Sequence, residues 1–272
     1  MPSIPHDTPS EPFVALRGLL PPGTPVEVER FVDGLDLAER ATAGPLSRPY
    51  LVLNMISSTD GRATLGGRSG PLGGPADSEL LHALRTTVDA VMAGAGTVRA
   101  ERYSRLVCEE HDREIRRARG LSEEPLVCVV SGRLALDEGI PLLADPQARV
   151  AIVTASQASL PLECRARIDY VRAARDGALD LAAAMGELRE RLNVQTVLCE
   201  GGPHLNSNLL AAGLVDELFL TLSPKLAGGD VTSETLRILS GPELDPPAAL
   251  ELLGVSEHES YLFLRYRVLA PS

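Results

Sequence analysis

A glycine turn after a predicted strand is the most informative candidate binding segment of the sequence. The apolar run 196–199 ends at Glu200, and Gly-Gly-Pro at 201–203 leads into a helical stretch over 204–212. Glycine lets the backbone approach a ligand, proline suits the first helical position, and a helix N-terminus presents free N–H groups to a phosphate. A cofactor pyrophosphate would fit this turn, although tight turns of any α/β protein share the pattern.

A second turn of this kind follows the apolar run around Val91, where Gly-Ala-Gly-Thr occupies 94–97. Glycine turns at the carboxyl ends of neighbouring strands can flank one crevice. The spacing is similar to a Rossmann fingerprint, but Arg99 replaces the third glycine, so a Rossmann domain is the second choice. Either Arg99 or Arg133 could pair with a 2′-phosphate and favour NADPH over NADH, and a surface role is the alternative.

Polar side chains also occur where the first strong strand ends. Asn54 lies inside an apolar run, and a buried amide needs a partner, which either a neighbouring loop or a bound heterocycle could supply. Asp60 precedes Gly61, so it is either a turn residue or a carboxylate that faces a substrate. Glu200 would either contact a substrate and assist a proton transfer, or accept N–H bonds at the helix start.

The segments that position these turns predict an α/β fold with a mostly parallel sheet. Strand-length apolar runs alternate with helical stretches, which is typical of such a sheet. The runs lie at 50–55, 90–93, 126–130 and 150–153. Helices are predicted over 76–86 and 179–192, and strands over 250–255 and 261–268 would form a C-terminal antiparallel hairpin.

Two segments differ in composition from this pattern. Eight of the 21 prolines fall in the first 48 residues, so we predict an extension over 1–48, with one or two short helices, and a single domain over 49–272. The run 99–119 is densely charged with both signs, which predicts a solvated helix or loop.

Composition excludes several function classes. The net charge of −11 would repel phosphate backbones and anionic lipid, so no nucleic-acid or membrane partner is expected. Neither a signal-like N-terminus nor an apolar run near the ~20 residues of a membrane span is present in the sequence, which predicts a cytoplasmic location. The four cysteines, 20 or more positions apart, lack the spacing of a zinc site, so no metal is expected.

Four motifs in order resemble the reductase domain of bacterial riboflavin biosynthesis, the 5-amino-6-(5-phosphoribosylamino)uracil reductase family. They are SSTDGRAT at 57–64, VDAVMAGAGTVRAE at 88–101, CEGGPHLNSNLLAAGLVDEL at 199–218 and SPKLAGGD at 223–230. The resemblance implies a dihydrofolate-reductase-like fold, NADPH as the cofactor, a small heterocyclic substrate and a homodimer. The domain over 49–272 would be the reductase domain.

The resemblance also assigns site residues. The residues that would face the substrate are Asn54, Asp60, Ser69, Arg85 and Glu200, with Glu200 and Asp60 as the catalytic candidates and Arg85 as a holder of the substrate phosphate. The residues that would line the NADPH site are Ile56, Gly94, Gly96, Thr97, Ser131, Gly201, Gly202, Pro203, His204, Leu205 and Asn206. Such an enzyme holds cofactor and substrate in line while hydride passes to an imine-like carbon.

The sequence departs from the family pattern in two respects. The H-x-E and P-C-x-x-C signatures of the zinc deaminase that many bacterial members carry are absent, so only the reductase step is expected. The family's D-P-x-L-x-x-R, whose arginine helps to hold the substrate phosphate, is replaced by ERYSRLVC at 101–108, where Arg102 or Arg105 would have to substitute. A dihydrofolate or dihydropteridine reductase and a non-catalytic NADP-binding protein are therefore the alternatives.

Overall fold

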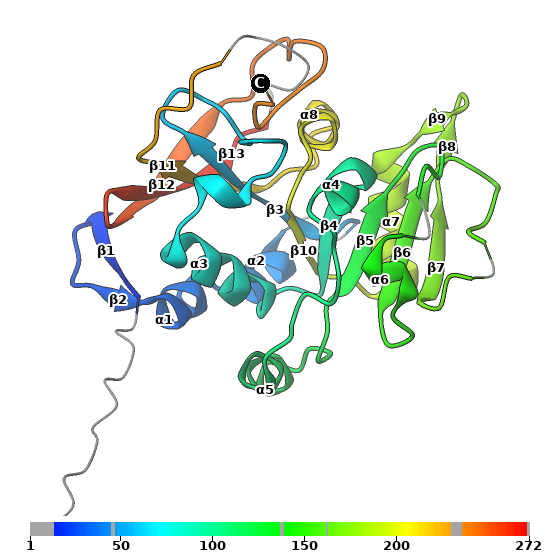
Figure 1. Cartoon of the computed structure of the whole chain (residues 1–272), viewed down its shortest axis with the longest axis horizontal. Coiled ribbons are helices and arrows are strands. Elements are labelled where there is room, and N and C mark those ends of the chain that lie inside the picture. The colour runs from blue at the N-terminus through cyan, green and yellow to red at the C-terminus, as the bar shows by residue number, and fades with distance from the viewer. Residues whose placement is uncertain (1–13, 45–46, 137–138, 162, 230–235, 271–272) are drawn as a thin grey trace, which may run out of the picture.

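An eleven-stranded sheet forms the centre of the molecule (Figure 1). The computed structural model describes residues 14–44, 47–136, 139–161, 163–229 and 236–270. In spatial order the strands are β2 (Val26–Glu27), β1 (Ala15–Leu20), β12 (Leu250–His258), β13 (Tyr261–Val268), β11 (Glu217–Ser223), β3 (Tyr50–Ser58), β10 (Thr196–Cys199), β4 (Ala90–Gly94), β5 (Leu126–Val130), β6 (Arg149–Thr154) and β7 (Arg167–Arg172). A separate two-stranded sheet pairs β8 (Ala174–Arg175) with β9 (Ala178–Leu179).

The strands from β11 to β7 in this order are parallel, and those from β13 to β2 add antiparallel pairs. The hairpin of β12 and β13 pairs with β11 through β13, with Phe219 opposite Arg265. The prediction of a mostly parallel sheet with a C-terminal antiparallel hairpin is therefore confirmed. These are the features of the expected dihydrofolate-reductase-like fold.

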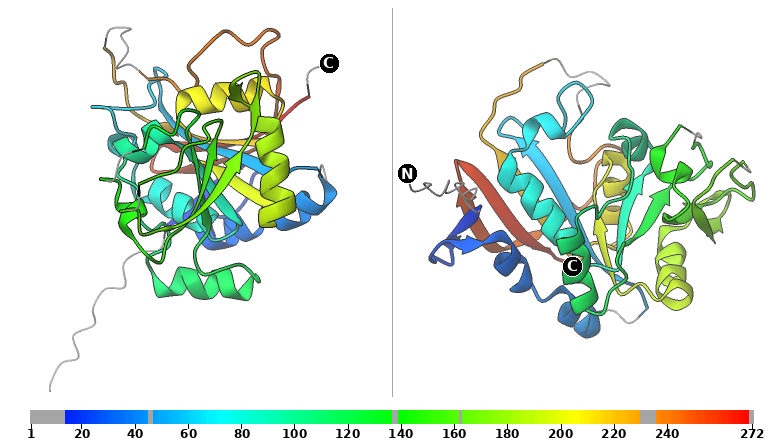
Figure 2. Two further views of the ribbon diagram at one scale, coloured as in Figure 1. Left: turned by 90° about the vertical axis from the view of Figure 1, so that its right-hand side faces the viewer. Right: turned by 60° about the horizontal axis from the view of Figure 1, so that its bottom comes forward.

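Helices cover both faces of the sheet (Figure 2). Their bounds are α1 (Val28–Asp33), α2 (Leu37–Ala43), α3 (Pro75–Arg85), α4 (Ala95–Ala100), α5 (Glu110–Ala118), α6 (Pro141–Ala144), α7 (Leu181–Leu192) and α8 (Pro203–Ala211). Because successive strand residues point to opposite faces, Val52 packs in a core with α1, α3 and α4, whereas Leu51 and Leu53 pack with α7 and α8. The helices predicted over 76–86 and 179–192 correspond to α3 and α7.

The segment before β3 is fastened to the sheet. One or two short helices were expected there, and the structure has two, α1 and α2. The strand β1 is also present and pairs with β12, with Arg17 opposite Glu257.

A buried carboxylate joins this segment to the sheet. The Glu217 carboxylate is fully buried and accepts hydrogen bonds from Arg265 Nε and Tyr50 Oη, both at 2.7 Å, while Arg40 of α2 lies 3.3 Å away. Burial and Glu217 raise the pKa of Tyr50 above its ordinary value, so its hydroxyl stays a donor. The domain boundary after residue 48 stays a prediction.

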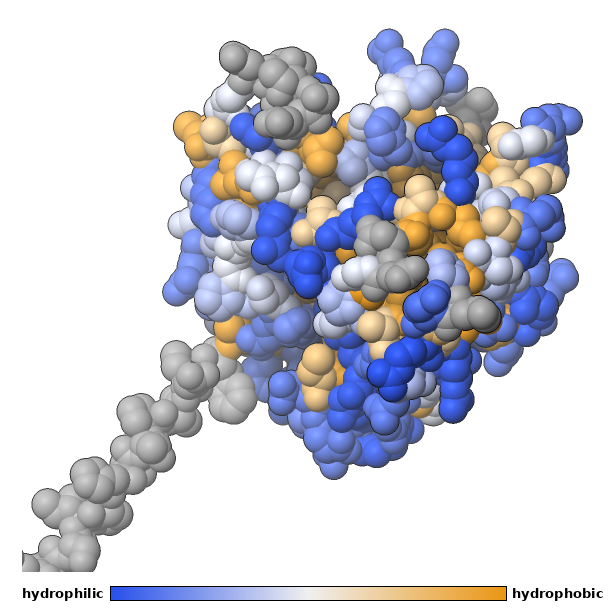
Figure 3. Space-filling model, turned by 45° about the vertical axis from the view of Figure 1, so that its right-hand side comes forward, coloured by the Kyte–Doolittle hydropathy of each residue, from blue (hydrophilic) through white to orange (hydrophobic). Residues whose placement is uncertain are grey.

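No helix within the described ranges is long and apolar enough to cross a membrane. Hydrophilic residues predominate on the face shown in Figure 3, in keeping with the net charge of −11. Within the same described ranges, no group of three or more metal-ligating side chains gathers in one place.

Candidate active site

The two glycine turns lie side by side, because β10 and β4 are parallel neighbours whose carboxyl ends meet. Gly94 N donates a hydrogen bond to Gly201 O at 2.7 Å, which joins the turns directly. Gly201 has a φ of +93°, which favours glycine. A Cβ added at Gly202 would lie 2.7 Å from Thr97 Oγ1, so only glycine allows the first turns of α4 and α8 to approach this closely.

A cavity of about 300 Å³ opens beside these turns on the face of the sheet that α3 and α4 cover. Six of the residues assigned from the sequence line it: Asn54, Ile56, Ser69, Arg85, Thr97 and Glu200. Asn54 and Ile56 project from β3, and Glu200 follows the last residue of β10. Among the residues that the structure describes, none forms a hydrogen bond with the Asn54 amide, which leaves it to a ligand in the cavity.

Glu200 is held in one orientation by two partners from other elements. Arg85, at the end of α3, donates from Nε and Nη2 to the two carboxylate oxygens, each at 2.8 Å, and the side chains are 11% and 7% exposed. Tyr103 donates from its hydroxyl to Glu200 Oε2. The guanidinium of Arg85 is therefore directed at Glu200, and the structure places this predicted phosphate holder in the cavity wall as the partner of another site residue.

Electrostatics fix the protonation states of both partners of Glu200. Burial alone would lower the pKa of Arg85, but the adjacent Glu200 carboxylate outweighs it, so the pKa lies above its ordinary value. Burial and the same carboxylate raise the pKa of Tyr103. Arg85 stays charged and Tyr103 stays a hydroxyl donor throughout the working pH range.

Ser69 is anchored by a residue at the end of α4. Glu101 Oε1 accepts hydrogen bonds from Ser69 N at 2.8 Å and from Ser69 Oγ at 3.0 Å. This contact holds the glycine-rich segment 66–74 over the cavity, so that Ser69 forms part of its wall.

Asp60 lies outside the residues that line the cavity. Its carboxylate accepts hydrogen bonds from Ser58 Oγ at 2.5 Å, from Gly228 N at 2.7 Å and from Ala227 N at 3.1 Å. The bond from Ser58, followed by those from the two amides, lowers the pKa of Asp60 to about 2. Of its two interpretations, the structure places Asp60 in the turn, where it ties β3 to the loop after β11.

Apart from Ile56 in the cavity wall, the residues assigned to NADPH lie at the two helix starts, on the first turns of α8 and after β5. Six of them gather at the two helix starts: Gly94, Gly96, Thr97, Gly201, Gly202 and Pro203. His204 is exposed on the first turn of α8, whereas Leu205 packs in the core beneath it. Asn206 is fully buried and donates to Ile238 O at 2.8 Å, so its amide faces away from the crevice. Ser131 follows β5, where its Oγ accepts from Ala135 N at 2.9 Å.

Three titratable residues of the cavity wall were not predicted as site residues: Asp77, Glu101 and Tyr103. Asp77 lies in the first turn of α3, and the other two follow α4. Glu101 and Tyr103 belong to the segment 101–108, the same segment in which the sequence departs from its family pattern. The departure from the family pattern could have pointed to Glu101 and Tyr103, but only the arginines of this segment, Arg102 and Arg105, were considered as site residues.

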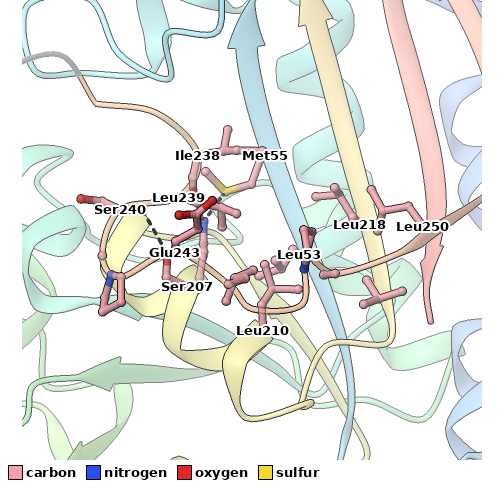
Figure 4. A pocket seen from close by; sticks show the side chains of 17 residues that line it. Leu53, Met55, Ser207, Leu210, Leu218, Ile238, Leu239, Ser240, Glu243 and Leu250 are labelled. Atoms are coloured by element: carbon pink, nitrogen blue, oxygen red, sulfur yellow. Dashed lines mark hydrogen bonds between the residues drawn. The ribbon is translucent and has the colours of Figure 1, made fainter. Parts of the chain in front are cut away.

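A second and larger cavity, of about 440 Å³, lies on the opposite face of the sheet. Leu53 and Met55 of β3 line it, together with Leu210 of α8 and Leu218 of β11 (Figure 4). Its wall is mostly apolar, and it includes no residue assigned from the sequence except Asn206. The titratable residues assigned from the sequence that line a cavity, Arg85 and Glu200, both lie in the smaller one.

The chain is similar to known reductases in both sequence and structure. Residues 49–256 match the family model described as the RibD C-terminal domain. The chain is 30% identical over 185 residues to the 2,5-diamino-6-ribosylamino-4(3H)-pyrimidinone 5′-phosphate reductase of Methanothermobacter thermautotrophicus, which covers 67% of this chain and 81% of that protein. The reductase of the same name from Archaeoglobus fulgidus is 28% identical over 183 residues, which covers 67% and 83%. A solved pyrimidine reductase-like protein from Corynebacterium diphtheriae superposes with a TM-score of 0.69 at 25% identity, covering 90% of this chain and 100% of that one.

Proposed function

Since the chain belongs to the RibD C-terminal domain family, we propose that it is an NADPH-dependent reductase of a phosphorylated ribosylamino-pyrimidine in riboflavin biosynthesis. Relatives that match most of their own length are named as reductases of such a compound. The single observation that carries the proposal is the unpaired Asn54 amide, which faces a cavity beside two joined glycine turns. Asn54 is half-buried, and a heterocycle in this cavity would replace water as the hydrogen-bond partner of its amide.

The glycine turns suit the cofactor. A Cβ added at Gly96 would meet no heavy atom within 4 Å, so the space before the first turn of α4 is open to a ligand. The N–H groups at the start of α8, with Gly201 and Gly202, would hold the pyrophosphate. The exposed Arg99 and Arg133 would pair with a 2′-phosphate. When bound, NADPH supplies the hydride.

The cavity suits the substrate. Asn54 would donate to the pyrimidine, and Ser69 Oγ, whose proton goes to Glu101, would accept from it. The Glu200 carboxylate, kept in place by Arg85 and Tyr103, would accept from the amino or hydroxyl groups of the ribosylamino chain. Substrate and cofactor bound side by side would displace water from the space between these groups, which favours hydride transfer over hydrolysis of an imine. In this proposal Asp60 acts indirectly, because it fixes the turn that follows β3.

The phosphate would be bound by the arginines after α4. Arg102 is exposed at the cavity mouth and forms no ion pair with another described residue, whereas Arg105 lies 3.2 Å from Asp145. Arg102 is therefore the freer cation of the two. Both arginines belong to the segment 101–108, which replaces the family motif that contains the phosphate-binding arginine.

Replacing Arg102 by alanine is expected to raise the KM for the phosphorylated substrate about tenfold, the equivalent of one charge-assisted hydrogen bond of about 1.4 kcal/mol. The KM for NADPH should not change. Steady-state kinetics with the dephosphorylated nucleoside provide the control, because Arg102→Ala should leave its KM unaltered. Equal effects on both compounds would show that Arg102 does not contact the phosphate.

We also propose a homodimer that buries the face around the larger cavity. Leu250 and Leu252 of β12 are 43% and 41% exposed, and Leu250 also lines that cavity. Leu252→Glu is expected to convert a dimer into a monomer when molar mass is measured by light scattering after gel filtration. An unchanged mass would place the interface elsewhere. The cytoplasmic location expected from the sequence stays a prediction.

The reductase proposal is tested by supplying NADPH with the phosphorylated ribosylamino-pyrimidine and, separately, with dihydrofolate. Absorbance of the reduced nicotinamide should fall only with the pyrimidine. Oxidation with dihydrofolate alone would indicate the other reductase on this fold. Cofactor binding without oxidation in either mixture would indicate a protein that binds NADP without catalysis.

A further inference from the structure

Asp77 is a carboxyl group in the cavity that the proposed function has not yet used. It lies in the first turn of α3, and Leu81, one turn later, lines the same cavity. The other two carboxylates of the wall have fixed partners, because Glu200 accepts from Arg85 and Tyr103, and Glu101 accepts from Ser69. Asp77 differs from both, because it forms no ion pair with a described residue, whereas Glu200 pairs with Arg85 and Glu101 lies 3.4 Å from Arg68.

Asp77 lies near β11, the strand that pairs with β3. Hydrogen bonding from the Thr221 side chain is the larger of the two influences that lower the pKa of the Asp77 carboxyl group. Thr221 of β11 is paired in register with Ile56 of β3, which lines the cavity two residues after Asn54. Asp77 therefore stands over the part of the sheet from which the Asn54 amide projects.

The nearest cation does not neutralise Asp77. Lys225 Nζ donates to the carbonyl oxygens of Pro71, Leu72 and Gly73 at 2.8, 3.0 and 3.3 Å, and forms no ion pair with Asp77. Burial raises the pKa of Asp77 above its ordinary value, and the Thr221 hydrogen bond and the Lys225 charge offset this only in part. The carboxyl group therefore keeps its proton at a higher pH than an exposed aspartate does.

Reduction of a C=N bond needs a proton as well as a hydride. We propose that Asp77 is the catalytic acid that delivers this proton to the substrate nitrogen, a role that rests on the proposed reductase function. The carbon accepts hydride from the reduced nicotinamide, the π electron pair of the C=N bond moves to nitrogen, and nitrogen takes the proton from the Asp77 carboxyl group. NADP⁺ and an Asp77 carboxylate remain, and water returns the proton to Asp77.

The other ionisable groups of the cavity are poorly suited to this task. Tyr103 and Arg85 hold their protons too tightly, as the raised pKa values of both show. The charged groups that share the cavity wall with Asp77 are Arg85, Glu101, Arg102, Arg105 and Glu200, and Lys225 acts on Asp77 from outside that wall. Arginine and lysine among them would favour the carboxylate, so a direct measurement of the titration is part of the test.

The expected dependence of kcat on pH follows from the direction of the Asp77 pKa shift. Since the protonated form is active, kcat should fall as pH rises through the raised pKa of Asp77. Asp77→Asn keeps the size of the side chain and should lower kcat about 100-fold, the usual contribution of a general acid. The same variant should abolish that fall with pH. Glu79→Gln is the matched control, because Glu79 lies on the same helix, also has a raised pKa, and does not line the cavity.

Two further measurements test the role of Asp77 without relying on the activity of Asp77→Asn alone. Carboxyl ¹³C NMR of cofactor-free protein labelled at aspartate should show one resonance that titrates above the ordinary range and is missing from Asp77→Asn. Thr221→Val removes the hydrogen bond to the carboxylate, so it should move both that titration and the fall in kcat to higher pH. If Asp77→Asn does not fold, this second variant decides.

The outcomes separate the two proposals. Wild-type kcat and pH profile in Asp77→Asn, or an unmoved profile in Thr221→Val, would overturn the role of Asp77 and leave the reductase function intact. An ordinary aspartate titration for Asp77 would do the same. Failure of the wild-type protein to oxidise NADPH with the pyrimidine substrate would remove the reductase function, and the role of Asp77 with it.

Discussion

Replacing Gly96 by aspartate is expected to weaken NADPH binding about 30-fold while the protein stays folded. Gly96 is exposed in the first turn of α4, and an added Cβ would meet no heavy atom within 4 Å. The new carboxylate would stand where the cofactor's pyrophosphate is proposed to lie, and two like charges about 5 Å apart at an effective dielectric of about 20 repel by roughly 3 kcal/mol. Salt screening at this exposed site reduces the repulsion to about 2 kcal/mol, which corresponds to the roughly 30-fold loss. Titration of the reduced nicotinamide fluorescence measures the dissociation constant.

Gly96→Asn is the control for this prediction, because it adds the same volume without the charge. It should bind NADPH within a few-fold of the wild type, and the difference between the two variants should shrink at high ionic strength. Gly201→Asp should weaken binding as well, but there the positive φ of Gly201 adds backbone strain to the charge. Equal affinities of Gly96→Asp and Gly96→Asn would remove the phosphate from this turn.

Replacing Arg85 by methionine is expected to destabilise the protein by about 3 kcal/mol and to abolish most of its activity. The change would leave the nearly buried Glu200 without its cation, and breaking such a pair at one end is costly. A chain of this size should lose about 8 °C in Tm by differential scanning calorimetry. The kcat should fall together with the Tm, because Glu200 would no longer be held in the cavity.

The double variant Arg85→Met/Glu200→Met separates stability from catalysis. Replacing both members of a buried pair by apolar side chains is often neutral, so the Tm should recover most of its loss while the activity does not. If Arg85 held the substrate phosphate instead, Arg85→Met would raise the KM for the phosphorylated substrate and leave the Tm unchanged. That result would contradict the pairing with Glu200 as its main role.

Much of the architecture could be predicted because it depends on local pattern. Apolar runs of strand length marked β3, β4, β5 and β6, and apolar spacing marked α3 and α7. The two glycine turns could be placed together as well, because parallel strands bring their carboxyl ends to one edge. Order along the chain and strand direction were sufficient for these features.

The orientation of single side chains could not be predicted in the same way. Asn206 and Leu205 lie on the first turns of a helix whose start faces the crevice, yet both are buried. Which side of a helix faces the core depends on the strands beneath it, and these belong to distant parts of the sequence. For the same reason, motif matches alone did not show that Arg85 turns to Glu200 instead of outward.

Arg116 shows the same limit within a charged segment. The run 99–119 was expected to be solvated, and much of α5 is, but Arg116 is fully buried. Its guanidinium donates to Ser122 O at 2.7 Å and to Val88 O at 2.8 Å, and also to Arg85 O. Carbonyl groups near the C-terminal end of α3 need such donors, and nothing in the spacing of charges within 99–119 indicates which arginine supplies them.

The two outermost strands of the sheet limit how copies of this protein can join. A long, flat edge strand would recruit another chain by backbone pairing. Here one margin is β2, only two residues long, and the other is β7, which carries Arg167 and Arg172 at its two ends. Neither margin offers a long uncharged row of backbone donors and acceptors, so ribbon-like growth is disfavoured and self-association is directed to side-chain packing between broad surfaces.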